Sequence, residues 1–159
     1  MATNRGKEFE GKFIISFKEL PNSSIDRLYD PTAGFKGIKN ICDFIAYVFP
    51  YIHYIETKST KGNTFPFDRL TQYDQLLNKK GIFGVNAGAV IWFIEHQKIC
   101  WVDIEEFERL KKENYKSINV KMIGDPKYSV IEIPTTPLRV HLKADYTKLL
   151  EIARNKWQK

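Results

Sequence analysis

Two acids and a lysine stand in a stretch of sequence that is otherwise mostly apolar and aromatic. Asp43 begins this stretch, Glu56 follows thirteen positions later, and Lys58 lies two residues beyond it. Hard divalent cations such as Mg²⁺ take carboxylate oxygens as ligands, and an ammonium group can orient an attacking water or offset charge on a phosphate. Asp, Glu and Lys around Mg²⁺ form a set that can hydrolyse a phosphodiester.

The spacing of the two acids suggests that they face each other across a β-hairpin. Residues 41–48 and 51–58 are rich in β-branched and aromatic side chains and predict two strands, with a turn near Phe49 and Pro50. Facing residues of an antiparallel hairpin have a constant sum of residue numbers. A turn between positions 49 and 50 sets this sum at 99, which is also the sum for Asp43 and Glu56. Their Cβ atoms would then lie about 5 Å apart, with Lys58 on the face of Glu56.

Two carboxylates at this distance repel, so a cation or a proton must lie between them. A purely structural interpretation stays open at this point, with Glu56, Thr57 and Lys58 as an exposed strand end and Asp43 as a satisfied polar group. Pro50 is not a favoured residue for a two-residue turn, and a shift of one residue would send Asp43 to the other face.

The remaining pattern predicts a mixed sheet flanked by helices, of class α/β, in a single domain over residues 1–159. The first helix is expected to be capped by Thr3 or Asn4, and Glu10 lies on or beside its buried stripe. Residues 21–40 have the composition of a long loop. Further strands are expected at 85–95, 98–104, 118–122 and 128–133, and further helices from Pro66 to about residue 80, at 104–113 and at 145–157.

Composition indicates an intracellular, cytoplasmic globular protein. Hydrophobic residues make up 43% of the chain, no apolar run is long enough to span a membrane, and the N-terminus has no signal-peptide core. Cys42 and Cys100 are expected to be buried free thiols. The net charge of +6 favours polyanionic partners.

Taken together in order, these residues resemble the PD-(D/E)xK nucleases and, within them, the RecU-type Holliday junction resolvases, including short phage-like versions. The sequence NRGKEFE at 4–10 is similar to that family's opening, with Glu10 as its helical glutamate. Asp43 matches the strand aspartate and ETK at 56–58 the Glu-x-Lys triplet. TFPFDRLTQYDQL at 64–76 is similar to the Phe-Pro motif and following helix, with Gln72 as its glutamine.

This resemblance implies a restriction-endonuclease-like fold and a Mg²⁺- or Mn²⁺-dependent endonuclease. Asp43, Glu56 and Glu10 would bind the metal, Lys58 would position the water, and Gln72 would support the site. The enzyme would resolve four-way DNA junctions in recombination and repair by paired symmetric nicks, leave 5′-phosphate ends and act as a homodimer. Residues 21–40 would correspond to a shortened junction-entering stalk.

Basic residues that flank these motifs are the candidates for phosphate contacts. They are Arg5, Lys36, Lys39, Lys61 and Arg69. Two alternatives stay open: another DNA endonuclease of the same superfamily, of restriction or repair type, and a non-catalytic module that binds DNA junctions.

Overall fold

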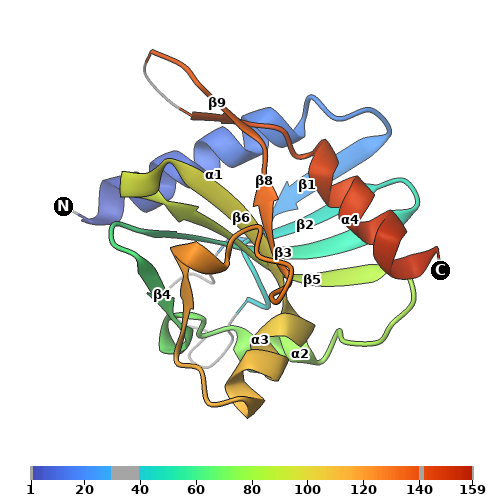
Figure 1. Ribbon diagram of the computed structural model, residues 1–159. Helices are drawn as coiled ribbons and strands as arrows, with labels where there is room; N and C mark the ends of the chain where they lie inside the picture. The colour runs from blue at the N-terminus through green and yellow to red at the C-terminus, as the bar shows by residue number, and fades with distance from the viewer. Residues whose placement is uncertain (1, 30–39, 140–141, 159) are drawn as a thin grey trace, which may run out of the picture.

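The structure, a computed structural model, describes residues 2–29, 40–139 and 142–158 (Figure 1). A six-stranded sheet runs through the centre, in the order β1-β2-β3-β5-β6-β8. β3 and β5 are parallel, and the other neighbours in this sheet are antiparallel. The strands are β1 (Ser23–Arg27), β2 (Phe44–Val48), β3 (Tyr51–Thr60), β5 (Val85–Phe93), β6 (Lys98–Asp103) and β8 (Val130–Ile133).

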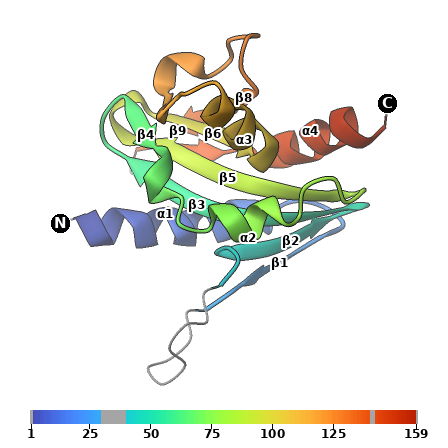
Figure 2. The same ribbon diagram turned by 90° about the horizontal axis from the view of Figure 1, so that it is seen from below.

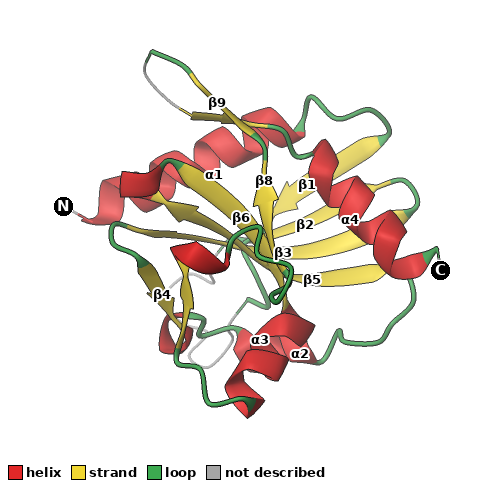
Figure 3. Cartoon of the chain, viewed as in Figure 1, coloured by secondary structure: helices red, strands yellow, loops and turns green. Residues whose placement is uncertain are grey.

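Among the described residues, four α-helices and two small strand pairs surround this sheet (Figure 3). The helices are α1 (Ala2–Phe17), α2 (Tyr73–Leu77), α3 (Ile104–Lys112) and α4 (Thr147–Trp157). The strand pairs are β4 (Thr64–Pro66) with β7 (Ser117–Asn119), and β9 (Thr135–Pro137) with β10 (Leu142–Ala144). In the described part of the chain, no helix has both the length and the apolar character needed to cross a membrane.

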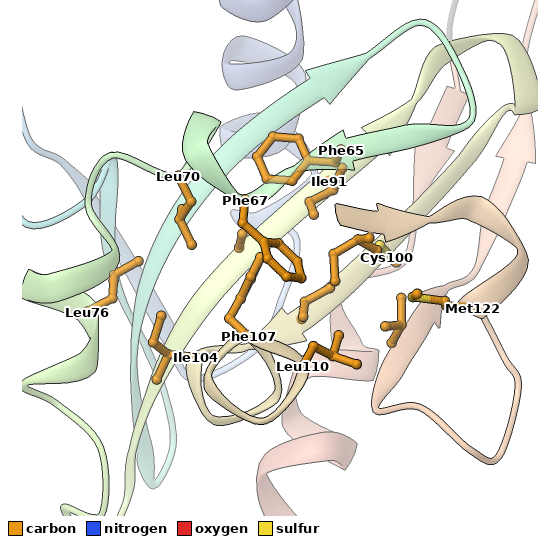
Figure 4. Packing of buried hydrophobic residues seen from close by; sticks show 14 of the residues in the cluster. Phe65, Phe67, Leu70, Leu76, Ile91, Cys100, Ile104, Phe107, Leu110 and Met122 are labelled. Atoms are coloured by element: carbon orange, nitrogen blue, oxygen red, sulfur yellow. The ribbon is translucent and has the colours of Figure 1, made fainter. Parts of the chain in front are cut away.

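Each face of the sheet carries its own hydrophobic core. Phe9, Phe13 and Phe17 of α1 and Leu149 of α4 pack on one face, together with Phe44, Ile55 and Trp101 of the strands. The other face is covered by α2, α3 and the β4–β7 pair, and Figure 4 shows Phe65, Phe67 and Phe107 meeting Ile91 and Cys100 there. Because alternate strand residues point to opposite faces, successive residues of β3 and β5 belong to different cores.

Gly88 is needed where β5 passes β6. A Cβ built on Gly88 would lie 2.3 Å from the carbonyl oxygen of Val102, so any larger residue would push the two strands apart.

The fold class is as expected, with a mixed sheet flanked by helices.

Several predicted boundaries are wrong. Residues 21–40 are not all loop, because residues 23–27 form β1, whose mostly polar sequence gains its apolar surroundings from β2. The helix expected from Pro66 is two short pieces, a 3₁₀ turn (Phe67–Arg69) and α2, since Phe65 and Pro66 pair with β7 and the helical φ/ψ pattern is interrupted at Leu70. The first helix begins at Ala2, ahead of the expected caps.

Other differences are smaller. The strand expected at 41–48 begins at Phe44, and those expected at 85–95 and 118–122 end earlier, each passing into a 3₁₀ turn. The β9–β10 pair is a feature that the sequence pattern did not predict. Cys42 and Cys100 are buried free thiols, as predicted. The central part of the proposed stalk, residues 30–39, lies outside the described residues (Figure 2).

Candidate active site at the open edge of β3

The hairpin register is the one that the sequence predicts. Phe44 pairs with Ile55 and Val48 with Tyr51, so the residue numbers of facing partners add up to 99 throughout the β2–β3 ladder. The turn lies at Phe49 and Pro50. Asp43 is the residue just before β2, and continuation of the same register sets it opposite Glu56.

β3 extends beyond the end of β2 and has an open edge there. The β2–β3 ladder stops at Ile55, while β3 stays paired with β5 as far as Thr60. In the described part of the chain, residues 56–60 therefore have a strand neighbour on one side only. An open strand edge leaves backbone and side-chain groups accessible to a ligand, and Glu56 and Lys58 lie on this segment.

Asp43 is held at this edge by Thr57. The backbone N–H of Thr57 donates to Asp43 Oδ2 over 2.9 Å, and its hydroxyl Oγ1 donates to the same oxygen over 2.8 Å. The aspartate therefore satisfies the first free N–H of the β3 edge and is fixed beside Glu56. This geometry differs from a simple cross-strand pair, because Asp43 precedes β2 and its carboxylate bonds to the residue after Glu56.

Glu56 and Lys58 point to the side of the sheet that carries α2 and α3. Their partners in β5 are Ala89 and Ile91, both members of that core. Lys58 Nζ lies 3.1 Å from Glu56 Oε1. The second oxygen, Glu56 Oε2, is buried and has no hydrogen-bond partner among the described residues.

The electrostatic state of Glu56 reflects this crowding. Burial, and after it the negative charge of Asp43, raises the pKa of Glu56 to about 7, although Lys58 lowers the pKa in part. The charge of Glu10 adds a smaller contribution that also raises the pKa. A buried carboxylate with a raised pKa beside a second carboxylate is the arrangement that a bound cation would stabilise.

Glu10 approaches from the other face of the sheet. It lies on α1, and its Oε2 forms an ion pair with Nη1 of Arg27 over 2.5 Å. Arg27 is the last residue of β1 and the partner of Phe44, so this ion pair lies next to the residue that follows Asp43. Within residues 2–29, 40–139 and 142–158, no three His, Cys, Asp or Glu side chains are grouped closely enough to hold a metal ion.

The oxygen atoms present nevertheless fit a hard cation. Asp43 and Glu56 supply carboxylates from adjacent chain segments, and Glu56 Oε2 is a buried acceptor without a donor. Mg²⁺ is commonly held by only one or two carboxylates, with waters and substrate phosphate completing its octahedron. Glu10 is brought toward this pair but remains bonded to Arg27.

The predicted supporting glutamine has other contacts. Gln72 stands at the N-terminus of α2, and its side-chain oxygen accepts a hydrogen bond from the Thr71 hydroxyl over 3.0 Å. A second glutamine of this helix, Gln75, buries its Oε1 without a hydrogen-bond partner in the part of the chain that the structure describes. Sequence reasoning did not single out Gln75.

The basic residues expected to contact DNA are distributed unevenly. Arg69 lies next to the candidate site, since its Nη2 donates to the carbonyl of Ser59 over 2.9 Å. Lys61 is exposed in the turn after β3. Arg5 is exposed on α1, about 140° around the helix from Glu10. Lys36 and Lys39 lie outside the described residues.

Two residues at the site were missed by the sequence analysis, Arg27 and Thr57. Arg27 belongs to β1, which was interpreted as loop. Thr57 is the middle residue of the Glu-x-Lys triplet, where the motif places no requirement.

Comparison with known proteins finds a solved structure with a similar fold. A solved structure of Hjc, a Holliday junction resolvase from the archaeal hyperthermophile Archaeoglobus fulgidus, is similar over 80% of this chain and 95% of its own, with a TM-score of 0.53. The sequence identity is 17%, so the similarity concerns the fold. No protein-family profile matches the chain. No curated protein matches it either.

Proposed function

We propose that this chain is a Mg²⁺- or Mn²⁺-dependent endonuclease that resolves four-way DNA junctions inside the cell by paired symmetric nicks. The observation that carries this proposal is the pairing of Asp43 with the Glu56-Thr57-Lys58 segment at the open edge of β3. A fold similar to that of a Holliday junction resolvase supports the substrate class. The RecU-type assignment rests on the opening NRGKEFE and the Phe65-Pro66 motif.

In this proposal Asp43 and Glu56 hold the divalent cation, with Glu10 as an additional acid once it leaves Arg27. The cation, when bound, activates a water and neutralises charge on the scissile phosphate. Lys58 orients the attacking water and stabilises the developing negative charge from its position 3.1 Å from Glu56. Gln72 supports the site only if α2 moves its side chain away from Thr71.

The chain's own basic residues then position the DNA. Arg69 is bonded to the backbone of β3 one residue beyond Lys58, so a phosphate at the edge of β3 would lie close to its guanidinium. Arg27 balances Glu10 in the metal-free protein and becomes available for a phosphate when Glu10 turns to the cation. Arg5 and Lys61, and with them Lys36 and Lys39, supply further contacts that salt would weaken.

Paired nicks on a four-way junction require two sites related by a two-fold axis, so we infer a homodimer. The turn end of the β2–β3 hairpin carries the surface that fits this partner. Tyr47, Ile52 and Phe49 are exposed there, and Ile82 and Phe83 are exposed on the segment before β5, whose Gly84 accepts a hydrogen bond from Ile52 N–H. We call these five residues the turn-end patch.

Charge favours a second copy of the chain as the partner for the turn-end patch. None of its five residues is charged, and Tyr47 and Phe49 line a shallow hollow together with three neutral polar residues, Asn22, Ser23 and Ser24. DNA would need cations, whereas a two-fold contact sets each surface against itself and so favours a neutral, apolar one. The turn-end patch can therefore face its own copy across a two-fold axis without bringing like charges together.

The test is cleavage of a synthetic four-way junction and of a linear duplex of the same sequence, with Mg²⁺, with Mn²⁺ and with chelator. We expect metal-dependent cutting of the junction at least about tenfold faster than of the duplex, with 5′-phosphate ends. Equal rates on both substrates would remove the junction specificity and leave a nuclease of another type. Junction binding without any cutting in either metal would indicate a non-catalytic module.

A further inference from the structure

A cavity of about 320 Å³ lies on the opposite flank of α1 from Glu10, between α1, the β5–β6 strands and the β9–β10 pair. Phe9, Ile99 and Tyr146 form buried parts of its lining, and Trp92 is half-buried there. A volume of this size suits a small ligand of about the dimensions of a nucleotide. None of the carboxylates of the candidate active site lines it.

The chemistry of the lining combines aromatic rings with positive charge. The rings of Phe9 and Trp92 are 5.5 Å apart at an angle of 38°. The lining also carries Arg5 and Arg139, which are exposed, and a half-buried Lys12 that forms an ion pair with the one acid, Glu8. Aromatic faces bind nucleobases by stacking, and guanidinium and ammonium groups bind phosphates. Apolar surface alone would suit many ligands, but the excess of cations over acids in the lining favours one that carries a phosphate.

A buried donor in the cavity wall lacks an acceptor. Trp92 Nε1 is buried and has no hydrogen-bond partner among the described residues. An indole N–H is a donor only, and a buried donor without an acceptor costs free energy that a ligand oxygen or ring nitrogen would recover. The carbonyl oxygens and ring nitrogens of nucleobases provide such acceptors.

The cavity is close enough to the candidate site for one DNA strand to reach both. Phe9 directly precedes Glu10 on α1, and Trp92 pairs with Ser59, the residue that follows Lys58. The body of α1, about 10–12 Å wide, separates the cavity from Glu10, and Asp43 and Glu56 lie farther away, on the α2 and α3 side of the sheet. A stacked DNA strand covers this width in about three nucleotides.

We propose that this cavity holds one unstacked nucleotide of the bound DNA, at least about three positions from the scissile phosphate. Its base packs against Phe9 and Trp92 and accepts a hydrogen bond from Trp92 Nε1, and its phosphate contacts Arg5 and, once it leaves Glu8, Lys12. Unstacking a base costs a few kcal/mol in duplex DNA and less where pairing is already interrupted. The pocket therefore adds a preference for branched over continuous duplex DNA. This inference rests on the proposed nuclease function.

The first test measures binding of thymidine monophosphate to the wild-type chain in chelator, by ligand-observed NMR, so that no cleavage is involved. Saturable binding is expected, weaker for thymidine than for the monophosphate. Trp92→Phe keeps an aromatic ring but removes the donor, and should weaken binding about fivefold. Arg5→Gln should weaken the monophosphate only, while Lys7→Gln, an equal charge loss on α1 outside the cavity, should change neither.

The second test uses four-way junctions that carry 2-aminopurine, a base whose fluorescence reports unstacking, at successive positions from the cut. One position should change its fluorescence when the wild-type chain binds in chelator, and Trp92→Phe should reduce that change while Trp157→Phe leaves it. The proposal is overturned if the wild-type chain does not bind thymidine monophosphate. It is also overturned if Trp92→Phe and Arg5→Gln both bind thymidine monophosphate as tightly as the wild-type chain does. If the monophosphate binds but no position responds, the assignment to DNA is overturned. These assays contain no metal, so a failure of the catalytic proposal is seen separately, in the cleavage assay.

Discussion

The two ends of the β2–β3 hairpin differ in what they bury: the open end buries a carboxylate, and the turn end exposes aromatic side chains. At the open end Glu56, a charged residue, is only 2% exposed, with Asp43 beside it. At the turn end Phe49 is 61% exposed and Tyr47 41%. Buried carboxylates and exposed aromatic clusters both cost stability or solubility unless a ligand or a partner compensates. In our proposal one hairpin therefore serves two tasks, binding of a cation and phosphate at its open end and of a second subunit at its turn.

The largest effect is expected from Asp43→Asn at the open end. The asparagine oxygen can still accept the hydrogen bonds of Thr57, so the fold should be kept while one metal ligand loses its charge. Junction cleavage in Mg²⁺ should fall on the order of 100- to 1000-fold, with junction binding retained. Cleavage rates and gel-shift affinity measure the two effects. Full activity of Asp43→Asn would contradict the assignment of the open end.

Lys58→Ala should also slow the chemical step, about 100-fold in single-turnover rate, because the water and phosphate lose the ammonium group. The Kd of Lys58→Ala for the junction should change by a smaller factor than its cleavage rate does. Single-turnover cleavage and equilibrium binding separate the two quantities. An increase of Kd by tenfold or more, with little change in rate, would make Lys58 a DNA-anchoring residue instead.

At the turn end, Phe49→Ser together with Phe83→Ser should convert the proposed dimer into a monomer. Each monomer should still nick a junction strand, but the two nicks should no longer occur within one binding event. Light scattering and a cruciform plasmid assay, which distinguishes nicked from linear product, measure these effects. Ile15→Ser, an exposed apolar residue of α1 outside the turn-end patch, is the matched control and should remain dimeric. A double variant that stays dimeric would place the interface elsewhere.

The smallest effect concerns the stability of the metal-free protein. The pKa of Glu56 is raised to about 7, so the folded chain binds an extra proton relative to the unfolded chain between about pH 4.5 and 7. Stability is therefore highest below this window and falls as the pH rises through it. Glu56→Gln should stabilise the chain by about 2–3 kcal/mol at pH 8, and by much less at pH 4.

Urea unfolding in chelator measures this difference, with Glu151→Gln on the exposed side of α4 as the control. An equal effect of Glu56→Gln at both pH values would show that the Glu56 carboxylate is not strained by burial and by Asp43. The raised pKa of Glu56 would then no longer support a cation site at the open end.

The sequence predicted the hairpin register because alternation and the turn position constrain it strongly. Phe44, Ala46, Val48 and Ile55 point to one face, and a one-residue slip would expose them. The sheet-and-helix class followed from the same patterning. The positions of Asp43, Glu56 and Lys58 along the chain therefore determined most of the candidate site.

The parts that were not predictable depend on tertiary contacts. The sequence of β1 is mostly polar, and only its pairing with β2 makes it a strand. The helix expected after Pro66 is interrupted because Phe65 and Pro66 pair with β7, a partner more than fifty residues away. The Glu10–Arg27 ion pair joins α1 to β1 and depends on both. Local propensity contains no information about such distant partners.

The most direct test of the central claim is a crystal structure of the chain soaked in Mn²⁺, with the ion located by its anomalous scattering. The account predicts a peak at the open edge of β3 within about 2.5 Å of oxygens of both Asp43 and Glu56, with Lys58 Nζ alongside. A peak bound by neither carboxylate, or a structure in which Asp43 and Glu56 remain without metal at saturating Mn²⁺, would contradict it.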